Sequence, residues 1–141
     1  MSESTLPVRH LYALKLETDG APIVMPSGPQ GTRMVVGVKG GHFKGDRMSG
    51  TVESPGGDWV TRRSDGSIKV DVRLILRTDD GAPILVTYTG IGLMEEGQLQ
   101  VRSTPLFETG DERYAWLNTV QAVGIGAMVG ADVVYDVYEL L

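Results

Sequence analysis

The chain has 141 residues, which suits one domain around one hydrophobic core. Its formal net charge is −5 and its densest basic group is the pair Arg62-Arg63, so a nucleic-acid partner is not expected. The absence of cysteine excludes disulfides, thiolate catalysis and cysteine zinc sites. No apolar run reaches the ~18 residues of a membrane-spanning helix, and the first ten residues do not resemble a signal peptide. We expect one cytoplasmic domain over residues 1–141, away from membranes, with residues 1–7 as a flexible N-terminus.

Strand patterns follow one another from the start of the chain. Residues 8–20 alternate in polarity and end at an Asp19-Gly20 turn of hairpin type. One face of this strand should hold Val8, His10, Tyr12, Leu14 and Leu16. The following segments predict a short strand with a loop, a strand that runs into a glycine pair, and a stretch bent at two glycines. These segments are residues 21–32, 33–41 and 42–54.

The clearest strand pattern covers residues 66–81, and residues 82–92 return as its partner after an Asp80-Gly81 turn. Its apolar face should consist of Ile68, Val70, Val72, Leu74 and Leu76. Another strand is expected at residues 97–103, and two more fall within residues 119–141 as a closing hairpin.

One short helical turn is expected near residues 110–117, where Thr109 and Glu112 have the spacing of a capping box. About nine or ten strands and one helical turn define an all-β domain. Glycine bends favour a single closed or nearly closed antiparallel β-barrel, because closure removes exposed strand edges. A barrel of this size can hold one small ligand. A two-sheet sandwich is the alternative.

Asp71 and Arg73 stand two residues apart on the polar face of the 66–81 strand. This face is either solvated, with the aliphatic face in the core, or it lines a polar lumen. In the second case the guanidinium would keep the carboxylate ionised, or the carboxylate would serve as a positioned base.

Asp58 lies between the glycine pair Gly56-Gly57 and Trp59, one of two tryptophans in the chain. This stretch is either a turn beside a core tryptophan or an inward bend that makes Trp59 the wall of a pocket. In the second case, contact with the indole would remove water from Asp58 and raise its pKa towards acid–base use.

Aromatic and amide side chains supply the remaining candidates. Trp116 and Asn118 lie in the expected helical segment, which could close one end of a barrel and place Trp116 either in the lumen or in the core. Tyr88 lies on the return strand and is either a phenolic hydrogen-bond donor or simply a strand aromatic. The two histidines, His10 and His42, are too few for a zinc site. Nucleotide-loop and nucleophile-elbow patterns are also missing, so we expect neither a metal nor another cofactor.

Three stretches of the chain resemble the family known as domain of unknown function 3237. They read GGHFKGDRMSGTVESPGGDW, VDVRLILRTDDGAPILVTYTG and TPLFETGDERYAWLN. The resemblance extends from about Leu11 to Glu139 and implies a small cytoplasmic β-barrel, often a homodimer, without implying an activity. Recurrent family positions that backbone geometry alone does not explain are Asp58, Trp59, Asp71, Arg73, Trp116 and Asn118.

These observations favour a cofactor-independent enzyme that acts on a small, partly apolar, carbonyl-containing molecule. Such an enzyme would be a lyase or hydratase, an isomerase or a cyclase. The expected catalytic residues are Asp58, Asp71 and Arg73. The expected substrate-binding residues are Trp59, Tyr88, Trp116, Asn118 and Phe43. A barrel that binds a small ligand without turnover is the alternative, and a structural dimer without a ligand is a third interpretation.

Overall fold

The structure is a computed structural model that describes residues 4–141. In chain order its elements are β1 (Val8–Thr18), β2 (Ile23–Gly28), β3 (Gly31–Lys44), β4 (Ser49–Val52), β5 (Gly56–Arg62), β6 (Ile68–Thr78), β7 (Pro83–Glu95), β8 (Gln98–Ser103), β9 (Leu106–Glu108), the 3-10 helix η1 (Glu112–Thr119), β10 (Ala122–Val129) and β11 (Asp132–Leu140). Residues 4–7 precede β1 without regular structure, and residues 1–3 lie outside the described part. The flexibility expected for residues 1–7 therefore stays a prediction.

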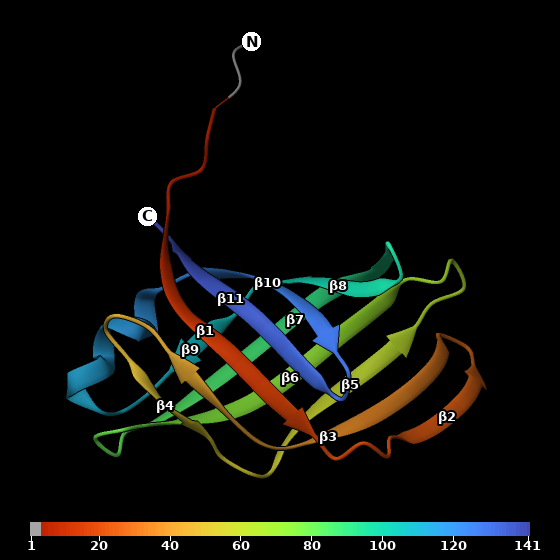
Figure 1. Ribbon diagram of the computed structural model, residues 1–141, viewed down its shortest axis with the longest axis horizontal. Coiled ribbons are helices and arrows are strands. Elements are labelled where there is room, and N and C mark those ends of the chain that lie inside the picture. The colour runs from red at the N-terminus through yellow and green to blue at the C-terminus, as the bar shows by residue number, and fades with distance from the viewer. Residues whose placement is uncertain (1–3) are drawn as a thin grey trace.

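Eight strands close into one antiparallel ring (Figure 1). The order around the ring is β6-β5-β3-β1-β11-β10-β8-β7, and β7 pairs with β6 to complete it. The predicted all-β barrel is thus confirmed. The ring removes the free edges that an open sheet would expose, and it gives each strand one face towards the lumen and one towards solvent.

Three strands lie beside this ring rather than in it. β4 pairs with the second halves of β3 and β6, whereas β5 pairs with their first halves. β9 pairs with β7 next to the section that β8 covers, and β2 pairs with the start of β3. Each of the long strands β3, β6 and β7 therefore pairs with more than one short strand along its length.

The observed elements differ from the predicted ones at four places. β5 was not predicted because it begins at a glycine pair that suggests a turn, and β9 was not predicted because it has only three residues. β3 continues through the glycine pair to Lys44. The predicted capping box is wrong: Asp111 is the N-cap of η1 and accepts a hydrogen bond from the Arg113 backbone N–H, while the Thr109 hydroxyl donates to the Pro83 carbonyl.

The face predicted for β1 holds only in part. The pairing of β1 with β11 shifts register between His10 and Tyr12, which marks a β-bulge. Leu11 and Tyr12 are both buried, while Val8 and His10 are exposed. Strict alternation across Leu11 therefore fails, although Tyr12, Leu14 and Leu16 face the core as expected.

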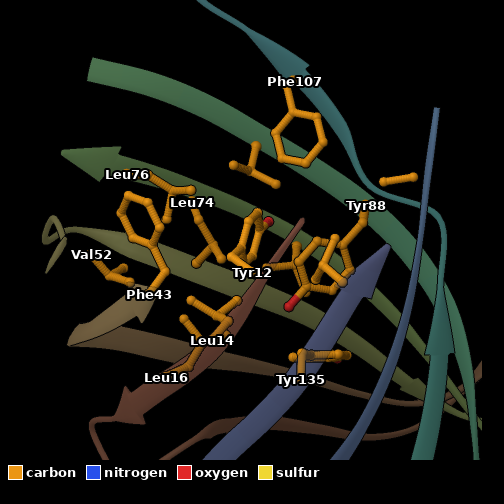
Figure 2. Close-up of a cluster of buried hydrophobic side chains, with 14 of the residues drawn as sticks. Tyr12, Leu14, Leu16, Phe43, Val52, Leu74, Leu76, Tyr88, Phe107 and Tyr135 are labelled. Carbon is orange, nitrogen blue, oxygen red and sulfur yellow. The ribbon is translucent and has the colours of Figure 1, made fainter. Parts of the chain in front are cut away.

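The lumen is filled by side chains rather than forming a pore. The predicted apolar face of β6 points inwards, and Leu74 and Leu76 are almost completely buried. At the barrel end that η1 covers, Leu117, Phe43 and Phe107 join this core. Figure 2 shows Tyr12 between Phe43 and Tyr88, so aromatic rings run along the middle of the barrel.

Gly126 on β10 gives room to a core side chain, which leads to the first prediction. It pairs with Tyr135 of β11, and a Cβ at position 126 would overlap the Tyr135 ring. Gly126→Ala should lower the free energy of unfolding by about 1–3 kcal/mol, as overpacking usually does. Urea unfolding measures the change. Gly110→Ala is the control, since a Cβ there meets nothing within 4 Å; equal losses for both variants would contradict the packing described.

Candidate active site

Asp58 points into the barrel from the middle of β5. Its neighbour on the same face, Val60, is buried, whereas Trp59 on the opposite face is 49% exposed. The two preceding residues, Gly56 and Gly57, lack side chains and so leave room for close packing on both faces of β5. A Cβ at Gly56 would lie 3.3 Å from Leu74 in the core, and one at Gly57 would lie 3.1 Å from the Trp59 ring outside. The glycines thus let the barrel wall pack closely on both sides of the acid.

The Asp58 carboxylate is held by the backbone of the neighbouring strand. The β5–β6 ladder pairs Asp58 with Val72 and resumes at Thr61 with Lys69, leaving a gap between them. Within this gap the Asp71 backbone N–H donates to Oδ1 of Asp58 over 3.0 Å. The side chain therefore has a fixed position on the lumen wall.

Burial raises the pKa of Asp58 from its usual value of 3.8 to about 6. The hydrogen bond from the Asp71 N–H acts in the opposite direction, and the Asp71 charge adds a smaller upward shift. The predicted rise is present, but its cause is the barrel interior rather than the indole of Trp59, which lies on the outer face. A carboxyl group with this pKa exchanges a proton readily near neutral pH.

A second carboxylate that faces inwards, Glu139 on β11, has a different environment. It accepts hydrogen bonds from the guanidinium groups of Arg9 and Arg47, the first over 2.7 Å. Within residues 4–141, no cationic side chain forms an ion pair with Asp58. Glu139 thus has the partners of a structural ion pair. Asp58 lacks such partners among the described residues.

Two buried tyrosines share the lumen with Asp58. Tyr88 comes from β7 and Tyr135 from β11, and their ring centroids are 5.5 Å apart in an edge-to-face arrangement. The pKa of Tyr135 is raised to about 12, mainly by burial and to a smaller extent by the Asp58 charge, while a hydrogen bond with Tyr88 acts in the opposite direction. Burial likewise raises the pKa of Tyr88, with additional contributions from Tyr135 and Asp58. Both phenols therefore stay protonated at neutral pH and can act as hydrogen-bond donors.

The inward-facing side chains are less completely buried at the end of the barrel opposite η1. This end carries the β5–β6, β7–β8 and β10–β11 turns, away from the helix (Figure 1). Inward-facing side chains near this end keep partial exposure, as Val36, Asp58 and Ile68 show. At the helix end, by contrast, Leu76, Ile84 and Leu117 are completely buried. A small molecule would therefore approach Asp58 from the end that carries these turns.

Three predicted site residues lie together outside the barrel. Trp59, Asp71 and Arg73 project from the outer face of β5 and β6 and line a groove of about 290 Å³. A neighbouring groove of about 230 Å³ lies between Trp59, Ile75 and Leu85. The polar face of β6 is thus the outer face, and Asp71 and Arg73 do not meet Asp58 in the lumen.

The other predicted residues support the helix end. Phe43 is buried against Tyr12, with ring centroids 5.7 Å apart. The Arg47 guanidinium lies 3.9 Å from the ring centroid of half-buried Trp116. Asn118 accepts from the backbone N–H of Thr109 over 2.8 Å and donates to its carbonyl over 3.0 Å. These contacts fix η1 against the barrel.

Two side chains of the barrel interior, Tyr12 and Tyr135, were not among the predicted site residues. Alternation in residues 131–141 places Tyr135 with Val137 on one face, and the opposing strand presents Gly124 and Gly126. An aromatic residue opposite glycines on a paired strand is a signal in the sequence that could have identified Tyr135 as an interior residue. Tyr12 was assigned to the correct face of β1, but its central place among other rings depends on barrel closure.

A closed eight-stranded barrel with a carboxyl group and phenols inside defines the class of fold and site. The chain belongs to the family described as "Protein of unknown function (DUF3237)", whose model matches residues 7–140. The UPF0311 protein RPA1785 of Rhodopseudomonas palustris is 31% identical over 125 residues, which cover 79% of this chain and 82% of that protein. Its crystal structure superposes with a TM-score of 0.91 at 27% identity, over 99% of this chain and all of that one.

Other relatives extend this comparison to an enzyme. A β-barrel-like protein of Acinetobacter baumannii AYE has a TM-score of 0.91 and 26% identity, over 99% of both chains. The hydroalkoxylation enzyme phnH of Penicillium herquei is 37% identical over 87 residues, which cover 62% of this chain and 49% of that enzyme. The crystal structure of an enzyme from Penicillium herquei has a TM-score of 0.73 and 27% identity, covering 100% of this chain and 99% of that chain. This fold therefore occurs in an enzyme.

Two further features are absent from residues 4–141. No helix there is both long and apolar enough to cross a bilayer. No three side chains of His, Asp or Glu come together in a way that could hold a metal ion.

The raised pKa of Asp58 gives the second prediction. Between pH 3.8 and about 6 the native state keeps a proton that the unfolded chain has lost, so stability falls as pH rises through this window. Asp58→Asn removes this cost while keeping an oxygen for the Asp71 N–H. It should raise the free energy of unfolding at pH 8 by up to about 3 kcal/mol, and by little at pH 3.5.

Urea unfolding at both pH values measures this difference. Asp46→Asn is the matched control, because Asp46 is exposed and the same change there should have little effect at either pH. An equal gain from Asp58→Asn at both pH values would mean that Asp58 is not buried as described.

Proposed function

We propose that this protein is a cofactor-independent enzyme in which Asp58 moves a proton on a small, partly apolar molecule inside the barrel. The observation that carries the proposal is a carboxyl group with a pKa of about 6 in the lumen, without a cationic partner among residues 4–141. The protonated phenols of Tyr88 and Tyr135 stand beside it as hydrogen-bond donors. A proton acceptor and neutral donors among apolar side chains suit chemistry next to a carbonyl group.

The reaction that fits these groups is the addition of an O–H group across a C=C bond conjugated to a carbonyl, or its reverse. The Asp58 carboxylate takes the hydroxyl proton while the oxygen forms a bond to the β-carbon. The π electrons move to the carbonyl oxygen, where the Tyr88 phenol stabilises the enolate by a hydrogen bond. The Asp58 carboxyl then returns its proton to the α-carbon, so no atom, electron or cofactor is consumed.

The Penicillium relative supports this reaction class, since its name describes the addition of an alcohol to an alkene. Within this class the chain would be a lyase or hydratase when the oxygen comes from a second molecule. It would be a cyclase when the hydroxyl belongs to the same molecule. A cytoplasmic location and independence of nucleic acid, membranes and cofactors stay predictions.

The third prediction concerns turnover of small hydroxy-enones, whose conjugated absorption disappears when the ring closes. Asp58→Asn should lower kcat by at least about 10²-fold, because the proton acceptor is lost. Tyr88→Phe should lower kcat by about 10²-fold, the usual effect of losing one donor to a developing oxyanion. The wild-type kcat/KM should rise with pH and level off above about 6, where Asp58 is ionised.

Asp46→Asn is the matched control for the carboxyl change, since Asp46 is exposed in the connection between β3 and β4. Absorbance assays and mass spectrometry of the products measure the rates. Probes that bind but come back unchanged would contradict the enzyme and favour a ligand-binding barrel. Full activity of Asp58→Asn would exclude Asp58 as the proton carrier.

We also propose that the protein is a homodimer that pairs through the outer face of β5, β6, β7 and β9. Four large apolar side chains are exposed on this face, namely Trp59, Ile75, Leu85 and Leu106. Asp71 and Arg73 lie beside them, and neither forms an ion pair with another described residue. Around a two-fold axis, the Asp71 of one copy can face Arg73 of the other twice, which makes the surface self-complementary.

The fourth prediction tests this dimer by charge reversal. Asp71→Arg and Arg73→Asp should each weaken the dimer, and the double variant should restore it, because the pair is reversed in both copies. Trp59→Ser should weaken it about 10-fold or more, as loss of a central aromatic side chain usually does. Sedimentation at several concentrations measures the association. Ile125→Ser, on an exposed site of β10, is the control. A wild-type protein that stays monomeric at about 100 μM would contradict the proposal.

A further inference from the structure

Ser103 carries a hydroxyl group that the fold itself does not use. The residue ends β8 and is 4% exposed, so it is far from bulk solvent. Its Oγ has no hydrogen-bond partner among the described residues. Buried polar groups are nearly always paired, and an exception needs a physical explanation.

Glycines flank this hydroxyl on both neighbouring strands. Ser103 pairs with Gly90 of β7 on one side and with Gly124 of β10 on the other. A Cβ at Gly124 would lie only 2.6 Å from Oγ of Ser103, so the hydroxyl points over the bare backbone of Gly124. An alanine at position 124 would therefore occupy the space in front of the hydroxyl.

The space over Gly124 belongs to the same part of the lumen as the candidate active site. The Cβ position built on Gly124 lies 3.6 Å from the Tyr135 ring and 3.7 Å from Val137. Tyr135 in turn contacts Tyr88, and the charge of Asp58 affects both phenols. β8 is separated from β5 by β6 and β7 in a ring of eight strands, so Ser103 and Asp58 lie on nearly opposite walls.

We propose that Ser103 binds an oxygen of the substrate remote from the reacting groups, so that the substrate carries oxygen functions at both ends of an apolar body. This inference rests on the proposed function for the reacting end of the molecule. The reacting end lies at Asp58 and Tyr88. The remote end presents a hydroxyl or carbonyl oxygen to the Ser103 hydroxyl, which can donate or accept. Between them, Val101, Val137 and the Tyr135 ring provide an apolar surface for a planar carbon skeleton.

The experiment compares two matched probe series on the full chain. One series consists of 2-hydroxyphenyl enones with a second hydroxyl at the end remote from the reacting carbon, and the other lacks that hydroxyl. Isothermal titration gives Kd for each probe with the wild type and with Ser103→Ala. The variant should bind the probes with the remote hydroxyl about tenfold more weakly and the probes without it equally well. The melting temperature of the ligand-free variant should stay the same or rise, since an unpaired buried hydroxyl is removed.

Ser67→Ala is the matched control. Ser67 is similarly buried, but its hydroxyl donates to Asp65 and accepts from Arg63. This variant should lose thermal stability and keep the wild-type Kd for both series, the reverse of the pattern expected at Ser103. Equal affinities of Ser103→Ala and the wild type for the probes with the remote hydroxyl would overturn the inference. A clear loss of stability in ligand-free Ser103→Ala, or no binding of either series to the wild type, would also overturn it. Probes that bind with the expected pattern but are not converted would contradict only the proposed function.

Discussion

Closure of eight strands into a ring is the constraint on which the rest of this structure depends. The pairing of β6 with β7 completes the ring, and it turns every strand into a wall with one inner and one outer face. Only then do side chains from distant parts of the sequence share a lumen. Asp58, Tyr88, Ser103 and Tyr135 come from four different strands, and none of them is close to another along the chain. The interior group is therefore a product of closure, whereas the outer group around Trp59 follows from neighbouring strands.

The lumen holds its acid at a cost in stability. Burial without a cationic partner makes the ionised form of Asp58 unfavourable, and only one backbone N–H compensates for the lost water. Elsewhere in the same barrel, Glu139 is stabilised by two guanidinium groups. Such destabilising buried groups are common at functional sites, where the pKa of a side chain is adjusted for chemistry instead of stability. The unpaired Ser103 hydroxyl is a second example of the same pattern.

Much of the fold follows from local sequence patterns. The alternation in β6 identifies its inner and outer residues without error, and the Asp80-Gly81 turn marks the hairpin with β7. The bulge at Leu11 could not be predicted, since it depends on the register between β1 and β11. β5 was not predicted because its glycines suggest a turn, although in the barrel they accommodate Leu74 on one side and Trp59 on the other.

The site was harder to predict than the fold. Asp58 and Tyr88 could be singled out by residue type, but adjacency in the sequence suggested that Trp59 shares a pocket with Asp58. In a strand, neighbouring residues point to opposite faces, so these two are separated by the barrel wall. The roles of Tyr135 and Ser103 depend on which strands meet across the lumen, and a single sequence does not contain that information.

The most direct test of this account is a ¹³C NMR titration of the Asp58 carboxyl carbon in the ligand-free protein, with Asp58→Asn used to assign the signal. The barrel interior disfavours the ionised form, so the carboxyl group should titrate with a pKa of about 6. Titration near 3.8, the ordinary value for an aspartate, would contradict this expectation. In that case Asp58 would be a hydrated surface acid, and the lumen would lack its proton carrier.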